Sequence, residues 1–343
     1  MPLWVWFAFV VLVTALILFD LVVLHRRSHA ISLRESLGWT GLWVFLALVF
    51  NGVVYGLYAG LFGPELSPAD GPRGDEAALQ FLTGYLVEYS LSVDNIFVIA
   101  MIIANFHVPR EHQHRLLFWG VLGAALLRGV MIVVGTTLVQ QFEWVMYIFG
   151  GLLILSAAKM LVTRHDNINP DGNLLIRLTR RLFPVTPEYH GKRFFVRQQG
   201  QWLATPMLLA LVLIESCDVM FAVDSIPAVF AITRDPFLIF TSNIFAILGL
   251  RSLYFALAGL MDRFRYLKMS LVFLLVFIGV KMLLMHHYPI PNVVSLAMIA
   301  GILAVGVGSS VFAGGQDTAR LHSPLEPEIA SACDQEDPSG IEK

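Results

Sequence analysis

Long apolar runs separated by shorter polar connections dominate the pattern of residues along the chain. Most of these runs reach or exceed the roughly 20 residues that an α-helix needs to cross about 30 Å of hydrocarbon. The runs lie at about 3–24, 37–61, 79–104, 116–139, 143–162, 204–233, 237–260, 269–285 and 293–313. This pattern predicts an all-α protein, a polytopic transmembrane helical bundle of about nine helices.

The polar connections divide the chain into larger units. The segment 163–203 is the longest interior connection, and it separates the chain near its middle. The residues from 314 to 343 hold seven acids and two bases among Pro and Ser, a composition typical of disordered segments. We therefore expect a transmembrane transporter domain over 1–313 and a disordered cytoplasmic tail over 314–343.

The positive charges of the connections predict the orientation in the membrane. The odd-numbered connections carry 15 Lys and Arg residues, whereas the even-numbered ones carry 2. Because cytoplasmic loops are enriched in these residues, we expect the N-terminus outside and both segment 163–203 and the C-terminus in the cytoplasm. The first run is expected to be a retained helix, since Arg26 and Arg27 follow it rather than precede it.

Three landmarks recur in the same order on the two sides of segment 163–203. Each set contains an acid five residues before V-D-x-I, then L-R within an apolar run, then K-M-L. The charged positions of the two sets are Glu88, Asp94, Arg128 and Lys159, and then Asp218, Asp224, Arg251 and Lys281. Corresponding runs are expected to enter the membrane from opposite sides, which predicts two inverted-topology three-helix repeats, at about 79–162 and 204–285. The alternative is that apolar helices resemble one another by composition.

Five carboxylates fall within the third and sixth apolar runs. They are Glu88, Asp94, Glu215, Asp218 and Asp224. A carboxylate at membrane depth costs several kcal/mol unless it is paired, protonated or ligated, so each one is a candidate functional residue. Arg128 and Arg251 are expected to support the site by offsetting two of these charges. The remaining excess of negative charge predicts a cationic substrate.

Asn95, Ser225 and Asn243 carry neutral side-chain oxygens. We expect them to support the same site as these acids. Such oxygen-rich ligation suits Mg²⁺, Mn²⁺ or Ca²⁺ better than zinc or copper. Acids six residues apart lie about 240° apart around a helix and therefore do not share one face. They either form two levels along a pathway or flank a local break in the helix. Pro227 favours such a break in the sixth run. The lysines of K-M-L lie near helix ends, where their ammonium groups are expected to reach the interface.

Composition and charge exclude several other classes. The chain is 57% hydrophobic and 14% charged, with a mean hydropathy of +0.71, unlike a soluble domain. Its net charge of −2 gives no reason to expect nucleic acid as a partner. Cys217 and Cys333 fit neither a disulfide framework nor a CxxC site, which argues against redox chemistry. An intramembrane aspartyl protease is disfavoured by the lack of G-x-G-D, so we expect neither an enzyme nor a cofactor.

Three stretches of the chain resemble motifs of the TerC family, in particular its Alx-like branch. They are GYLVEYSLSVDNIFVI at 84–99, FAVDSIPAVFAIT at 221–233 and TSNIFAILGLRSLYF at 241–255, and the resemblance extends over about 3–313. It implies a multi-pass transporter of the LysE-type superfamily in the bacterial inner membrane, associated with Mn²⁺ efflux. The acidic positions of the family fall on the same five carboxylates, although Ser216-Cys217 departs from the pattern expected before Asp218.

The residues and the resemblance together predict export of a divalent metal cation, with Mn²⁺ as the favoured ion. The ion is expected as the transported substrate and not as a cofactor. The expected partners are this ion, the lipid bilayer and protons, since carboxylates that bind H⁺ and a metal in turn can couple the two fluxes. The alternative is a non-transporting membrane scaffold or assembly factor linked to tellurium or alkaline stress resistance. Such a scaffold would tolerate neutral residues at Asp94 and Asp224.

Overall fold

The computed structural model describes residues 1–25, 33–63, 71–162, 174–191, 193–198, 200–258, 267–285, 287–288 and 290–321. Helices make up most of this part of the chain. They are α1 (Leu3–His25), α2 (Leu33–Tyr58), α3 (Gly74–Asn105), α4 (Arg110–Gln141), α5 (Val145–Val162), α6 (Leu174–Leu182), α7 (Pro206–Phe230), α8 (Pro236–Leu248), α9 (Leu250–Ala258), α10 (Leu267–Leu284) and α11 (Asn292–Leu321). Two strands, β1 (Phe195–Gln198) and β2 (Gln201–Ala204), pair antiparallel as a hairpin.

The predicted helical membrane bundle is confirmed. Seven described helices are long and apolar enough to cross a membrane, namely α1, α2, α3, α4, α5, α7 and α11. α8 and α10 are shorter apolar helices that coincide with the two remaining predicted runs. The run predicted at 237–260 is divided at Gly249, where α8 ends and α9 begins after one residue. The number of membrane crossings and the superposition of the two repeats stay predictions.

The break expected at Pro227 does not occur, so this expectation was wrong. α7 is continuous from Pro206 to Phe230 with Pro227 inside it. The proline lies in the last turn, where it removes a single donor, and the next amides still bond, as from Ala231 N to the Pro227 carbonyl at 3.1 Å. α3 is continuous across both of its acids as well.

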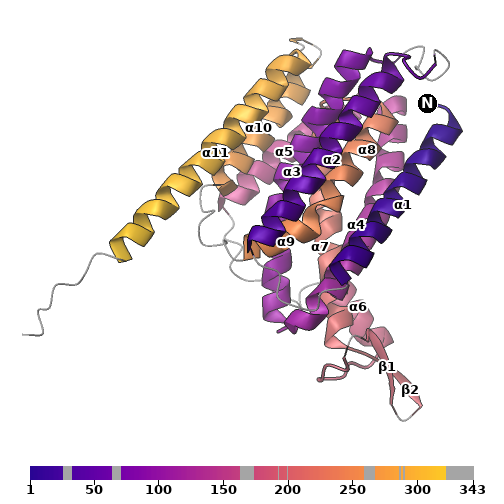
Figure 1. Cartoon of the computed structure of the whole chain (residues 1–343), viewed down its shortest axis with the longest axis vertical. Coiled ribbons are helices and arrows are strands. Elements are labelled where there is room, and N and C mark those ends of the chain that lie inside the picture. The colour runs from indigo at the N-terminus through magenta and orange to yellow at the C-terminus, as the bar shows by residue number, and fades with distance from the viewer. Residues whose placement is uncertain are drawn as a thin grey trace, which may run out of the picture.

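The long helices lie side by side in one bundle, with α3 and α7 in contact near its centre (Figure 1). α4 packs mainly on α7, whereas α8 packs mainly on α3. α5 and α10 pack against each other, and α11 lies at one edge against α3 and α10. The helices of the two predicted repeats are therefore in direct contact with one another.

Close backbone contact joins α5 to α10. A Cβ atom on Gly150 would lie 3.1 Å from the carbonyl oxygen of Gly279, and one on Gly279 would lie 3.0 Å from the carbonyl oxygen of Gly150. Small residues at such a crossing let two helices approach and gain dispersion energy that lipid cannot supply. The two glycines therefore fix the distance between the third helix of each proposed repeat.

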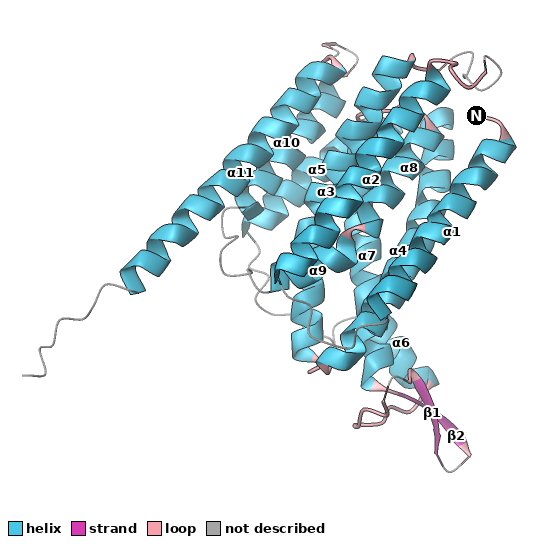
Figure 2. Ribbon diagram, in the orientation of Figure 1, coloured by secondary structure: helices cyan, strands magenta, loops and turns pink. Residues whose placement is uncertain are grey.

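The connection predicted at 163–203 has structure of its own. Figure 2 shows α6 and the β1–β2 hairpin protruding from one end of the bundle. Thr205 ties the hairpin to α7, because its hydroxyl donates to the Phe194 carbonyl at 3.0 Å and caps the helix by accepting from Leu208 N at 3.4 Å. At the far end of the chain, α11 continues to Leu321, so the first part of the predicted tail is helical. The rest of that tail, 322–343, lies outside the described residues.

Candidate functional site

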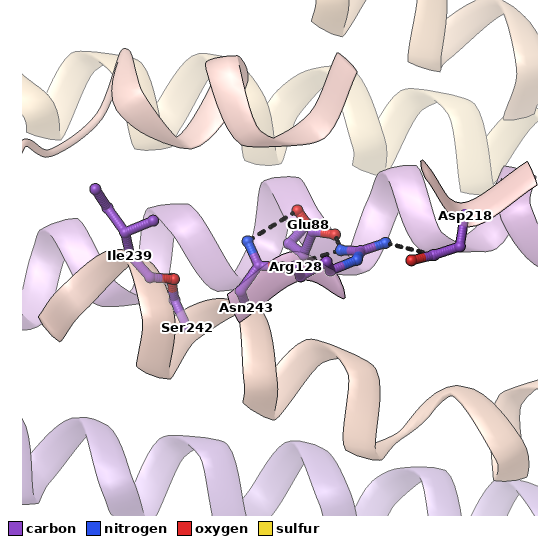
Figure 3. A network of polar contacts seen from close by, with 6 residues as sticks. All are labelled: Glu88, Arg128, Asp218, Ile239, Ser242 and Asn243. Carbon is purple, nitrogen blue, oxygen red and sulfur yellow. Dashed lines mark hydrogen bonds and ion pairs between the residues drawn. The ribbon is translucent and has the colours of Figure 1, made fainter. Parts of the chain in front are cut away.

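Four helices bring polar side chains together in the interior of the bundle. They contribute Glu88 from α3, Arg128 from α4, Asp218 from α7 and Asn243 from α8 (Figure 3). Glu88, Arg128 and Asn243 are fully buried, and Asp218 is 9% exposed. Three charged groups and one amide thus meet in the interior of the bundle, where apolar side chains are the rule. Because polar groups in this position are costly, we take this cluster as the candidate site.

Arg128 is the centre of this cluster. Its Nη1 forms an ion pair with Glu88 and donates a hydrogen bond to Asn243 Oδ1 at 2.9 Å. Its Nη2 lies 3.2 Å from Asp218 Oδ1. Asn243 in turn donates from Nδ2 to Glu88 Oε2 at 3.3 Å, as Figure 3 shows. One guanidinium therefore connects acids of both proposed repeats, and the amide closes the ring of contacts.

The charges of this cluster do not cancel. Two carboxylates face one guanidinium, which leaves one formal negative charge in the interior of the bundle. Breaking a buried ion pair of this kind typically costs about 3–5 kcal/mol, because the remaining charge has no partner. The two carboxylates therefore depend on Arg128 for stability, and the cluster keeps an excess of one formal negative charge.

A small cavity lies beside this cluster. It has a volume of about 30 Å³, and Asn95, Asp218 and Leu250 are among its lining residues. Asp218 Oδ2 and Asn95 Nδ2 are buried, and within the described part of the chain they have no hydrogen-bond partner. A space of this size holds about one water molecule or one small ion.

Glu215 lies one helical turn before Asp218 on α7, against a glycine of α4. A Cβ atom on Gly123 would lie 2.1 Å from Glu215 Oε1, so the carboxylate occupies this position because residue 123 has no side chain. Glu215 Oε2 is buried, and the described residues offer it no hydrogen-bond partner. Glu215 and Asp218 are close enough to interact electrostatically. This third acid therefore extends the negative region along α7.

The remaining two acids lie apart from Arg128. Asp224 accepts a hydrogen bond from Ser156 of α5 at 2.6 Å and interacts electrostatically with Lys159. Asp94 is half-buried on α3. Within the described ranges, no three His, Cys, Asp or Glu side chains come together closely enough to hold a metal ion. The five predicted carboxylates thus lie at several levels of the bundle, and their role as metal ligands stays a prediction.

The supporting residues have mixed outcomes. Asn95 and Ser225 are buried beside their aspartates, whereas the side chain of Arg251 lies outside the described residues. Lys281 was expected at the interface, and this expectation was wrong, because Lys281 is 6% exposed and its Nζ is buried. Gly123 and Ser156 were not predicted, since a small residue opposite an acid is recognised only once the helix pairing is known.

Comparison with known proteins agrees with this architecture. The chain matches the integral membrane protein TerC family over residues 73–317. An uncharacterised membrane protein of Myxococcus xanthus is 47% identical over 306 residues, which cover 89% of this chain and 91% of the relative. The Escherichia coli K12 protein named "Putative membrane-bound redox modulator Alx" is 44% identical over 301 residues, or 88% and 92% of the two chains. No solved structure matches. Because the family match and these relatives cover most of its length, the chain belongs to the TerC family of integral membrane proteins.

Proposed function

We propose that this protein exports a divalent metal cation, with Mn²⁺ as the preferred substrate, from the cytoplasm across the inner membrane. The observation that carries this proposal is the buried excess of carboxylates over Arg128 at the meeting of α3, α4 and α7. An uncompensated acid inside a membrane bundle is costly and is retained where a cation or a proton must bind. A helical membrane protein with such a cluster is best explained as a cation transporter.

The chemistry of the donors supports a hard cation. Glu88, Asp218 and Glu215 offer carboxylate oxygens, and Asp218 lines the adjacent cavity of about 30 Å³. Carboxylate and carbonyl oxygens suit Mn²⁺, Mg²⁺ and Ca²⁺, and the resemblance to the TerC family favours Mn²⁺ among them. In this proposal Arg128 holds the carboxylates while no metal is bound, and the arriving cation takes over part of its contacts.

Proton exchange is the proposed driving reaction. A carboxylate that releases a metal inside a low-dielectric site takes up a proton more readily than an exposed one, because burial disfavours its charged form. Metal and protons then compete for the same oxygens, and the two fluxes run in opposite directions. The compartment that receives the metal becomes more alkaline.

Flux measurements with purified protein in proteoliposomes test the function. Mn²⁺, Mg²⁺, Ca²⁺ and Zn²⁺ are offered in turn to the wild-type protein and to Asp218→Asn, Asp94→Asn, Asp224→Asn and Glu111→Gln. Asn keeps the size of Asp but removes the charge, so we expect Mn²⁺ flux to fall at least about tenfold in the three Asp variants, or ~1.4 kcal/mol. Glu111 is an exposed acid in the first turn of α4 and serves as the control.

The outcomes separate the parts of the proposal. Normal Mn²⁺ flux in all three Asp variants would reject the proposed pathway and favour the scaffold alternative, whereas a loss in Asp218→Asn alone would confine the metal site to the cluster around Arg128. A pH-sensitive dye inside the vesicles reports proton movement during Mn²⁺ uptake. Metal flux without alkalinisation of the lumen would reject proton exchange alone.

The names of the Alx relatives raise a redox role as a competing function. Cys217 is buried and unpaired on α7, and Cys333 lies outside the described residues. A thiol in an apolar environment is a poor nucleophile, so the described residues favour transport. Cys217→Ala is expected to transport Mn²⁺ normally, whereas loss of flux on replacement of this thiol would favour redox chemistry.

A further inference from the structure

A second, larger cavity lies at the end of α7 that is remote from the hairpin. It has a volume of about 620 Å³ and forms where the first turns of α3, α8 and α11 meet the last turns of α7 and α10. Lys281, Gln80, Arg234 and Asn292 are among its lining residues. None of these side chains belongs to the cluster around Arg128, so this cavity is a separate site.

Lys281 is the unexplained group of this cavity. It is 6% exposed, and its Nζ has no hydrogen-bond or ion-pair partner among the described residues. A buried ammonium without a partner costs several kcal/mol. Arg234 adds an exposed positive charge to the same lining, and no described residue forms an ion pair with it. Lys281 and Arg234 thus place two positive charges in a lining that also contains the carboxylates of Glu76 and Asp235.

The two acids of the lining already have partners. Asp235 caps α8 by accepting from Phe237 N at 2.8 Å and Leu238 N at 3.3 Å, and it also accepts from the Tyr58 hydroxyl at 2.7 Å. Glu76 accepts from Gln80 Nε2 at 3.1 Å. Both carboxylates are thus held at helix N-termini, where the backbone amides stabilise them. Neither carboxylate forms an ion pair with Lys281, so its buried ammonium has no counter-charge in direct contact among the described residues.

Gln80 specifies the anion further. Gln80 Nε2 donates to the Glu76 carboxylate, which has no proton to donate in return. The other end of the amide, Gln80 Oε1, therefore points away from Glu76. This oxygen is buried and has no donor among the described residues. An occupant that satisfies both side chains must accept from the Lys281 ammonium and donate to Gln80 Oε1. A water molecule can do both, and so can an anion that carries oxygen acceptors and a proton.

We propose that this cavity binds a small protonated oxyanion, of the class of hydrogen phosphate and hydrogen carbonate, between Lys281 and Gln80. The N-terminus of α11 at Asn292 is also part of the lining and adds a favourable dipole for an anion. A phosphodiester has the acceptors but lacks the proton. The cavity therefore favours the free acid anion over a headgroup that carries no other donor, such as phosphatidylcholine.

Equilibrium dialysis of inorganic phosphate against the full chain in phosphatidylcholine nanodiscs tests this site. The wild-type protein is expected to bind phosphate at one saturable site. Lys281→Met removes the charge at similar length and should weaken binding at least about tenfold, or ~1.4 kcal/mol. Lys281→Arg should keep it, and so should Arg115→Met, because Arg115 lies at the other end of the bundle against Phe194. Gln80→Leu should weaken phosphate but leave dimethyl phosphate, which has no proton to donate, unchanged.

Several outcomes would overturn the proposal. They are the absence of saturable phosphate binding, equal binding in Lys281→Met, and an equal loss in Arg115→Met, which would indicate general electrostatic attraction. Displacement of phosphate in phosphatidylglycerol nanodiscs would make the headgroup the occupant and reject a protonated anion. Monodisperse elution of Lys281→Met and retained binding in Lys281→Arg exclude misfolding as the cause of a loss. All of these measurements read binding rather than flux, so they are independent of metal transport.

Discussion

At the scale of single residues, the shape of the guanidinium explains why arginine lies at the centre of the site. Arg128 reaches Glu88, Asp218 and Asn243 at the same time from two terminal nitrogens. A planar group with five donors can serve three acceptors on three helices, whereas an ammonium is a compact point charge with fewer fixed directions. The packing of α3, α7 and α8 around α4 therefore depends on this one side chain.

Removing Arg128 should destabilise the protein strongly. Arg128→Met leaves Glu88 and Asp218 buried without their common partner, so we expect a loss of about 3–5 kcal/mol in the free energy of unfolding. Chemical unfolding in detergent micelles measures this change. The double variant Arg128→Met with Glu88→Gln removes one of the stranded charges and should recover part of the loss. Equal stability of wild type and Arg128→Met would contradict the ion-pair geometry.

A methyl group at Gly123 should displace Glu215. The added Cβ would lie 2.1 Å from Glu215 Oε1, the far end of a flexible side chain, so Gly123→Ala should move the carboxylate at a small cost in stability and lower Mn²⁺ flux. Gly151→Ala on α5 is the matched control, because a Cβ there meets no atom within 4 Å. Thermal unfolding and Mn²⁺ flux are measured for both. A change of equal size in the two variants would mean that Glu215 does not depend on Gly123.

The candidate acids could be predicted from sequence, whereas their partners could not. The cost of charge in lipid singles out Glu88 and Asp218 without any knowledge of structure. Which acid Arg128 reaches depends on helix rotation and tilt, which hydropathy does not determine. The same limit explains Lys281, whose position near a helix end predicted an exposed ammonium until the packing of neighbouring helices was known.

At the scale of helices, the α5–α10 crossing should tolerate no side chain at its closest point. A Cβ on Gly279 would lie 2.8 Å from Ile154 Cγ1 and 3.0 Å from the Gly150 carbonyl oxygen, so Gly279→Ala should separate the helices and cost about 1–3 kcal/mol. Gly301→Ala on α11 has open space and serves as the control. Thermal unfolding compares them. A Gly279→Ala protein as stable as the control would show that the crossing can relax without cost.

Apolar length predicts helices well because it is a local property of the chain, as α3 and α4 illustrate. The end of α8 at Gly249 has no such signal, since the apolar residues continue into α9. The β1–β2 hairpin was also missed, because a short pair of strands in a polar connection has no long hydrophobic period. Tertiary contact with α7 through Thr205 stabilises it instead.

At the scale of the whole molecule, the predicted orientation can be tested with single cysteines. In a background with Cys217→Ala and Cys333→Ser, Gln201→Cys is placed in the hairpin and Glu143→Cys between α4 and α5, both at exposed positions. The charge of the connections predicts that a membrane-impermeant thiol reagent labels position 143 from outside and position 201 only after the membrane is opened. The reverse pattern would invert the protein in the membrane.

The net charge at Arg128 has a consequence for the energy source of transport. Glu88, Asp218 and Arg128 together carry one formal negative charge, and a bound divalent ion would make the group positive by one. A membrane potential acts on such a charge with about 2.3 kcal/mol per 100 mV across the full field. An interior-negative voltage would draw the loaded group inward and the empty group outward, which opposes both halves of an export cycle. Export through this site therefore has to be driven by a second gradient, and exchange against protons provides one.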